Sequence, residues 1–149
     1  MILRRKVSVA LLALVFMVAL VYVTPVEAKK PLRWNYVNIP NPAPDITWSG
    51  PISGDTMEGT LYWFNQWYYF SDEGDQHFGG IWWIDCGSDG SVDILGTHKG
   101  VGPAGTLQFN INGRVTAACP DLTGRKMHTS GQIYLIDGVP TIIAVLQIN

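Results

Sequence analysis

The sequence predicts an all-β protein whose strands form an antiparallel barrel of seven or eight strands, and three observations carry this prediction. Sixteen glycines punctuate the chain at short intervals from Gly50 onward. The runs between them are rich in β-branched and aromatic residues, the usual composition of strands. No stretch combines a helical hydrophobic period with caps at both ends. A meander of such strands closes into a barrel without exposed edges, and a two-sheet β-sandwich is the alternative.

A β-hairpin within residues 77–98, HFGGIWWIDCGSDGSVDILGTH, is the clearest element. Residues 87–90, GSDG, suit a tight reversal. If they form the loop, Cys86 opposes Ser91, and alternation fixes which side chains share a face. One face then carries Ile81, Trp83, Asp85, Val92, Ile94, Gly96 and His98. The other carries Phe78, Trp82, Ile84, Asp93, Leu95 and Thr97, so both faces are apolar and we expect both to be covered.

The remaining strands follow from the same composition and punctuation. We expect strands at residues 46–53, 59–70, 77–85, 91–98, 106–118, 125–136 and 141–148. The barrel domain then spans residues 45–149. The preceding residues 29–44, KKPLRWNYVNIPNPAP, contain four prolines, which lack the donor that a strand needs. We expect a Pro-rich, polyproline-like arm there, not a strand.

Residues 1–28 have the pattern of a secretory signal peptide. A basic start at residues 4–6 precedes 17 uncharged apolar residues, 7–23, and small residues before a cleavage point after Ala28. The alternative is a single-pass membrane anchor through residues 7–23, because 17 residues is the lower limit for crossing a bilayer. In both cases the rest of the chain lies outside the cytoplasm, secreted or attached to the membrane.

The part of the chain from Lys29 onward is acidic. It has seven Lys and Arg against eleven Asp and Glu, a net charge of −4. This balance argues against nucleic acid as a partner. The sequence also has no phosphate-cradling glycine loop before a helix and no Gly-x-Ser-x-Gly elbow, so it predicts no cofactor and no serine-hydrolase chemistry.

Several glycine-bearing segments resemble one family. The chain has Gly50-Pro-Ile-Ser-Gly-Asp55 before Gly59-Thr60, a strand ending Gly96-Thr-His98, Gly113-Arg-Val-Thr116, and Gly124-Arg-Lys-Met-His128 before Gly131. These phrases resemble the small barrels of the allene oxide cyclase and dirigent type, and HF-x-G-I-W-W-I-D resembles further secreted proteins. The resemblance implies an eight-stranded antiparallel barrel with an apolar cavity, often oligomeric. None of the family's catalytic positions matches a residue here, so the resemblance implies no activity.

Cys86 and Cys119 are the two cysteines, and we expect them to form a disulfide in an oxidising compartment. The closed loop would contain 34 residues, for which chain entropy gives about 3 to 4 kcal/mol of stabilisation. Two buried thiols that pack as small apolar residues are the alternative.

The three histidines, His77, His98 and His128, lie on three different expected strands. In the register above, His77 and His98 share a face near one end of the hairpin, and with Asp85 they could serve as acid and base. Their spacing matches no metal motif, so a structural role is the favoured interpretation and no metal is expected.

Ten of the 22 residues from 62 to 83 are aromatic, more than one face of a strand pair can bury. We therefore expect an exported binding or interaction module, with an apolar or carbohydrate small ligand and self-association as candidates. The alternatives are a cyclase- or isomerase-type enzyme acting on an apolar molecule in the barrel cavity, and a membrane-anchored envelope structural protein. The candidate ligand-binding residues are Trp83, Ile94, His98, His77 and Asp85.

Overall fold

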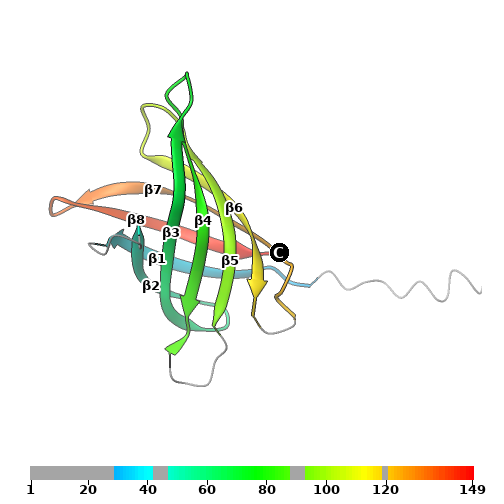
Figure 1. Cartoon of the computed structure of the whole chain (residues 1–149). Coiled ribbons are helices and arrows are strands. Elements are labelled where there is room, and N and C mark those ends of the chain that lie inside the picture. Colours follow the sequence, from blue (N-terminus) through cyan, green and yellow to red (C-terminus); the bar gives the residue numbers. More distant parts are fainter. Residues whose placement is uncertain (1–28, 42–46, 88–92, 119–120) are drawn as a thin grey trace, which may run out of the picture.

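The computed structural model describes residues 29–41, 47–87, 93–118 and 121–149, which form a closed antiparallel barrel of eight strands (Figure 1). The strands are β1 (Leu32–Pro40), β2 (Trp48–Gly54), β3 (Glu58–Phe70), β4 (Gln76–Asp85), β5 (Ile94–Gly102), β6 (Gln108–Ala117), β7 (Lys126–Ile136) and β8 (Val139–Ile148). Each strand pairs with the next, and β8 pairs with β1. The predicted all-β barrel is confirmed, and the sandwich alternative is not what forms.

The prediction of a polyproline-like arm is wrong for Leu32–Pro40, which is strand β1. The prolines lie at the margins of this strand, Pro31 before it and Pro40 at its last position, where a missing ladder donor costs little. Between them the chain alternates, and Trp34, Tyr36 and Asn38 point into the barrel. The barrel therefore begins at Leu32 and not at residue 45, and β1 is the strand that closes it.

The leader lies outside the described residues, so cleavage after Ala28 and anchoring through residues 7–23 both stay predictions. Among the residues that the structure describes, no helix is long and apolar enough to span a bilayer. Cys119 also lies outside them, so its pairing with Cys86 stays a prediction. No disulfide is present within the described ranges, where the buried Cys86 Sγ lies 3.0 Å from Met57 Sδ.

The register of the β4–β5 hairpin differs by one residue from the predicted one. Gly80 pairs with His98 and Ile84 with Ile94, so Trp82 and not Trp83 shares the barrel interior with His98. A slip of one residue exchanges the two faces of a strand. The physical reason lies in Gly96, the partner of Trp82, where an added Cβ would be 2.3 Å from the indole ring. Only a glycine there lets the Trp82 ring lie flat inside the wall.

The closed end of the barrel is filled with large apolar side chains from all eight strands. Those that are almost completely buried include Trp34, Ile52, Leu61, Trp82, Ile84, Ile94, Val115, Met127, Leu146 and Ile148. Burying each side chain of this kind contributes about 1.5–3 kcal/mol to folding. These side chains form the hydrophobic core of the barrel, and the same strands continue from it to form the open end.

A β-bulge interrupts β3 between Asn65 and Trp67, where Gln66 is the extra residue. Beyond the bulge the faces of β3 exchange, so that Trp67 and Tyr69 lie outside while Phe70, opposite Gln76, faces inward. The bulge is compact because Gly80 lies against it, and a Cβ at Gly80 would be 1.9 Å from the Phe64 carbonyl oxygen. Bulges redirect side chains in this way. Asn65 lies just before the bulge and keeps the inward direction of Leu61 and Trp63.

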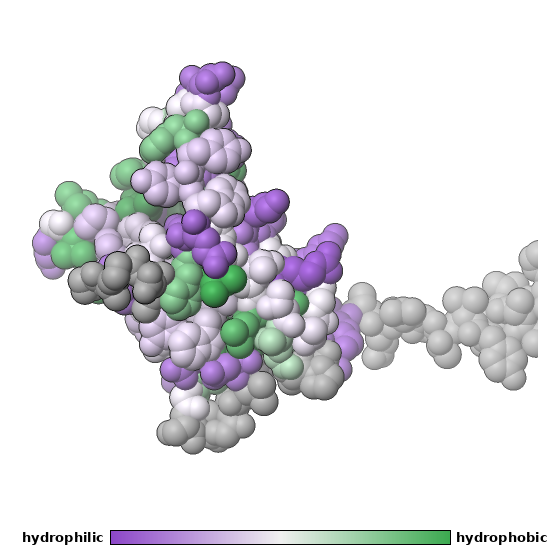
Figure 2. All heavy atoms as spheres, in the orientation of Figure 1, coloured by the Kyte–Doolittle hydropathy of each residue, from purple (hydrophilic) through white to green (hydrophobic). Residues whose placement is uncertain are grey.

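Two hairpins project from the open end in different directions (Figure 1). The β3–β4 hairpin rises at the top of the view, and the β7–β8 hairpin extends to the left. Both carry exposed apolar side chains, with Phe70 65% and Leu135 73% exposed. In Figure 2, green hydrophobic residues lie on both projections and also on the barrel wall below them, while the tip of the upper projection is purple.

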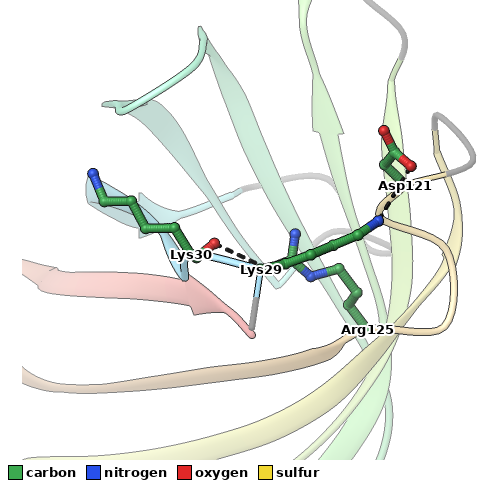
Figure 3. Close-up of polar contacts among 4 residues, drawn as sticks. All are labelled: Lys29, Lys30, Asp121 and Arg125. Atoms are coloured by element: carbon green, nitrogen blue, oxygen red, sulfur yellow. Dashed lines mark hydrogen bonds and ion pairs between the residues drawn. The ribbon is translucent and has the colours of Figure 1, made fainter. Parts of the chain in front are cut away.

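At the opposite end of the barrel, the start of β1 lies beside the end of β8 (Figure 3). Arg125 Nη2 donates to the carbonyl oxygens of Lys30 and Ile148, each at 3.2 Å, and so joins the start of β1 to the end of β8. The nearby ion pair between Lys29 and Asp121, at 3.2 Å, is exposed, and such a pair adds little stability.

Candidate functional site

The open end of the barrel encloses a cavity of about 290 Å³ to which all eight strands contribute. Most of its lining is aromatic or aliphatic, from Tyr36, Trp48, Trp63, Phe70, Phe78, Phe109, Leu107, Ile111, Ile133 and Ile142. The polar side chains in the lining are neutral, namely Thr47, Asn65, Gln76, Thr106 and Gln108. Within the described part of the chain, no Asp, Glu, Lys or Arg lines this cavity. The site therefore suits an uncharged ligand.

The barrel has room for a cavity because three of the five inward positions of strand β5 are glycines. These positions are Ile94, Gly96, His98, Gly100 and Gly102. Phe78 lies over Gly100, where a Cβ would be 2.4 Å from the ring. At Gly102 a Cβ would touch nothing closer than the Gln108 carbonyl oxygen at 3.4 Å. The glycines thus make room first for aromatic rings from β4 and then for the cavity itself.

An aromatic cluster forms the inner wall of the cavity. The Trp63 and His98 rings meet edge to face with centroids 5.0 Å apart, and Phe78 lies 6.3 Å from His98. Tyr36 packs against Trp63 at 6.2 Å, and its hydroxyl is hydrogen-bonded to Thr129 Oγ1 at 3.1 Å. Burial raises the pKa of Tyr36 well above its ordinary value of 10, so this hydroxyl stays protonated.

His98 and Asn65 form a polar pair inside this apolar wall. His98 is only 3% exposed, and its Nε2 lies 2.8 Å from Asn65 Oδ1. Its Nδ1 is buried and has no hydrogen-bond partner among the described residues. Burial lowers the pKa of His98 to about 4, because a charged imidazole would lose its hydration there. The ring is therefore neutral at physiological pH.

The low pKa of His98 predicts an acid-sensitive fold. The unfolded chain protonates this histidine near pH 6.5, whereas the folded protein does so only near pH 4. Above pH 6.5 His98 is neutral in both states and costs no stability. As the pH falls from about 6.5 to about 4, only the unfolded chain takes up the proton, so the free energy of unfolding falls progressively by about 3 kcal/mol in total. Urea unfolding between pH 7.5 and pH 4 measures the loss.

The control for this prediction is His98→Gln, which removes the titrating group while keeping a polar side chain. Carboxylates contribute their own acid dependence to both proteins, so the difference between the two unfolding curves isolates His98. An identical pH dependence in the two proteins would contradict the buried neutral imidazole.

The five predicted ligand-binding residues do not form one site. Ile94 lies in the closed end, and His98 lies behind the cavity wall. Trp83, His77 and Asp85 lie on the outer face, so the prediction of a shared face for His77 and His98 is wrong, because the register differs by one residue.

The three outward residues have structural contacts. Trp83 stacks on Tyr62 at 5.1 Å and donates from Nε1 to Asp93 Oδ2 at 3.1 Å. His77 stacks on Tyr69 at 4.8 Å. Asp85 Oδ1 accepts from the Gly87 amide at 2.8 Å, which supports the start of the turn.

Sequence reasoning missed Asn65 together with Gln76 and Gln108, three of the five polar side chains that line the cavity. A signal for Asn65 was present, because Asn65 and Gln66 interrupt the otherwise aromatic run YWFNQWYYF. Two adjacent polar residues break strand alternation and are typical of a bulge. Among the described residues, no group of three or more His, Cys, Asp or Glu side chains is placed to hold a metal ion.

Comparison with known proteins identifies no relative of this chain. No protein-family model, no curated protein and no solved structure matches the chain. The resemblance to barrels of the allene oxide cyclase and dirigent type therefore stays a prediction, and the function has to be argued from the cavity.

Proposed function

We propose that this protein is an exported binding module that holds one small, uncharged and largely apolar molecule in the open end of its barrel. The observation that carries the proposal is the lining of the cavity, which is aromatic and aliphatic with a few neutral polar groups. Ligand sites of proteins have this composition. Export, and any self-association of the barrel, rest on the sequence alone.

The size and neutrality of the cavity limit the ligand. A volume of about 290 Å³ lies at the lower limit of small-molecule sites, which start at about 300 Å³. A charged ligand would lose its hydration without gaining a counter-ion from the described lining, which is costly. A sugar would need more hydrogen-bonding partners than this lining offers, so an apolar molecule is the favoured class.

A catalytic role has less support than binding. Acid–base chemistry needs a group that exchanges a proton near neutral pH within reach of the substrate. Tyr36 lines the cavity, but the pKa of its hydroxyl is raised and the hydroxyl is engaged with Thr129. His98 stays neutral and reaches the lining only through Asn65. A cyclase or isomerase is therefore the weaker candidate.

Filling the cavity tests the proposal. Gly102 faces inward with space around it, so Gly102→Phe places a ring in the cavity. We expect wild-type protein to bind the neutral dye N-phenyl-1-naphthylamine saturably, with a rise in fluorescence, and Gly102→Phe to weaken binding more than about tenfold, or 1.4 kcal/mol. The sulfonated dye 8-anilinonaphthalene-1-sulfonate, on the same carbon skeleton, should bind at least about tenfold more weakly than the neutral dye.

The matched control is Val101→Phe, which adds a ring to the outer face of the same strand, where Val101 pairs with His77. It should leave the affinity for the neutral dye within about twofold, which is 0.4 kcal/mol. Equal binding by wild type and Gly102→Phe would place the dye outside the barrel and end the proposal.

A further inference from the structure

We infer that Asn65 is a hydrogen-bond donor fixed in the cavity wall, and that it selects ligands carrying a carbonyl or similar acceptor oxygen. This inference rests on the proposed function and names the ligand class that the cavity would take. Its starting point is that Asn65 both lines the cavity and is bonded to the buried His98.

The chain holds Asn65 in place from three sides. Asn65 follows the inward alternation of Leu61 and Trp63, and its pairing partner Gly80 packs against the bulge that begins directly after it. The Asn65 backbone amide donates to Thr47 Oγ1 at 3.0 Å. The side-chain oxygen is taken by His98 Nε2 at 2.8 Å. A side chain restrained in this way loses little entropy when it binds a ligand.

The hydrogen-bond balance around His98 decides which end of the Asn65 amide faces the cavity. A neutral imidazole has one N–H and one bare nitrogen. Since Nδ1 has no partner among the described residues, a proton there would be a buried unpaired donor, which proteins avoid more strictly than an unpaired acceptor. We therefore assign the proton to Nε2, which donates to Asn65 Oδ1.

This assignment leaves the Asn65 NH₂ group as the part of the amide that is available to a ligand. It makes no hydrogen bond to any described residue. The other polar groups are less suited to hold a ligand in the cavity, because Gln76 and Gln108 are exposed at the rim and the Tyr36 hydroxyl is already bonded to Thr129. With no charged group in the described lining, the predicted partner is a neutral acceptor such as a ketone, an aldehyde or an ester.

Two isosteric ligands test the inference. Acetophenone and α-methylstyrene differ only in that a carbonyl oxygen replaces a methylene group, and both can be assayed by displacement of N-phenyl-1-naphthylamine from the full chain. The readout is the ratio of their affinities in each protein. We expect Asn65→Leu to reduce this ratio about tenfold relative to wild type, or 1.4 kcal/mol, while α-methylstyrene still binds.

His98 is a positioning residue in this scheme, and two substitutions separate that role from simple packing. His98→Leu frees the Asn65 amide to rotate, so the ratio should fall as it does in Asn65→Leu. His98→Gln keeps an N–H near the position of Nε2 and should restore most of the wild-type ratio. A purely structural role would change the affinities for both ligands equally in both variants and leave the ratio unchanged.

A measurement on wild-type protein keeps the test independent of how the variants fold. Bound acetophenone should show its infrared carbonyl stretch at lower frequency than in hexane, as a hydrogen-bonded carbonyl does. A carbonyl frequency equal to that in hexane, or an affinity ratio unchanged in folded Asn65→Leu, would overturn the inference that Asn65 donates a hydrogen bond to the ligand. If neither the dye nor either ligand binds wild type, the proposed function itself fails, which distinguishes the two outcomes.

Discussion

Replacing Trp82 with alanine is expected to destabilise the barrel by about 4 kcal/mol. The indole is completely buried, it lies over Gly96, and its Nε1 donates to the Thr97 carbonyl oxygen at 3.2 Å. Alanine would leave a void lined by neighbours on both adjoining strands, and those strands cannot close it without breaking the wall. Equilibrium unfolding in guanidinium chloride measures the loss, provided that the slope of the transition is unchanged.

The adjacent Trp83 supplies the control. Its ring is on the outer face and partly exposed, so Trp83→Ala should cost about 1 kcal/mol, mainly the hydrogen bond to Asp93. The difference between the two substitutions should be at least about 2 kcal/mol, since one removes core volume and the other does not. Equal losses, or a larger loss from Trp83→Ala, would contradict the observed register and favour the one predicted from the turn.

Replacing Gly80 with alanine is expected to cost more than about 3 kcal/mol, beyond the usual range for overpacking. The added Cβ would lie 1.9 Å from the Phe64 carbonyl oxygen and 2.8 Å from the Gln66 amide nitrogen. Both contacts are backbone atoms of the bulge, so no side chain can rotate away. The strand pair has to separate at this point, and chemical denaturation reports the resulting loss of stability.

Gly102→Ala is the matched control for this prediction, because it is a second glycine on the inner face of the same sheet. Its Cβ has space, so the substitution should be neutral or stabilise the fold by up to about 1 kcal/mol through the unfolded chain. Gly80→Ala should also shift Asn65 away from His98, so any folded fraction should show the reduced carbonyl preference of Asn65→Leu. A cost for Gly80→Ala no larger than for Gly102→Ala would contradict the close approach at the bulge.

The barrel was predictable because its signals are local. Glycine punctuation, strand composition and the absence of a capped helix each depend on a few neighbouring residues, and all of them indicate the same class of fold. Strand β1 was missed because proline content was averaged over residues 29–44, whereas the prolines flank a continuous alternating segment from Arg33 to Ile39. The position of a proline within a segment matters more than the number of prolines.

The candidate site was less predictable because it depends on pairing between strands. A turn sequence does not fix register to one residue, and here one residue decides whether Trp82 or Trp83 faces the interior. The glycines of β5 were visible in the sequence, but their function as space for the rings of Trp82 and Phe78 appears only when β4 is aligned beside them. Asn65 faces the cavity because it continues the inward alternation of Leu61 and Trp63, and its place beside the His98 ring appears only when β3, β4 and β5 are aligned.

Arg125 holds the start of β1 and the end of β8 together at the same end of the barrel, and this placement has a practical consequence. Lys29 and Asn149 both lie at the floor of the barrel, near Asp121 and Lys126 respectively, on the side away from the ligand entrance. A tether fused ahead of Lys29 or behind Asn149 would hold the molecule by its base. Protein immobilised through either of these attachment points should therefore present its entrance to bulk solution, a convenient orientation for surface-based binding assays.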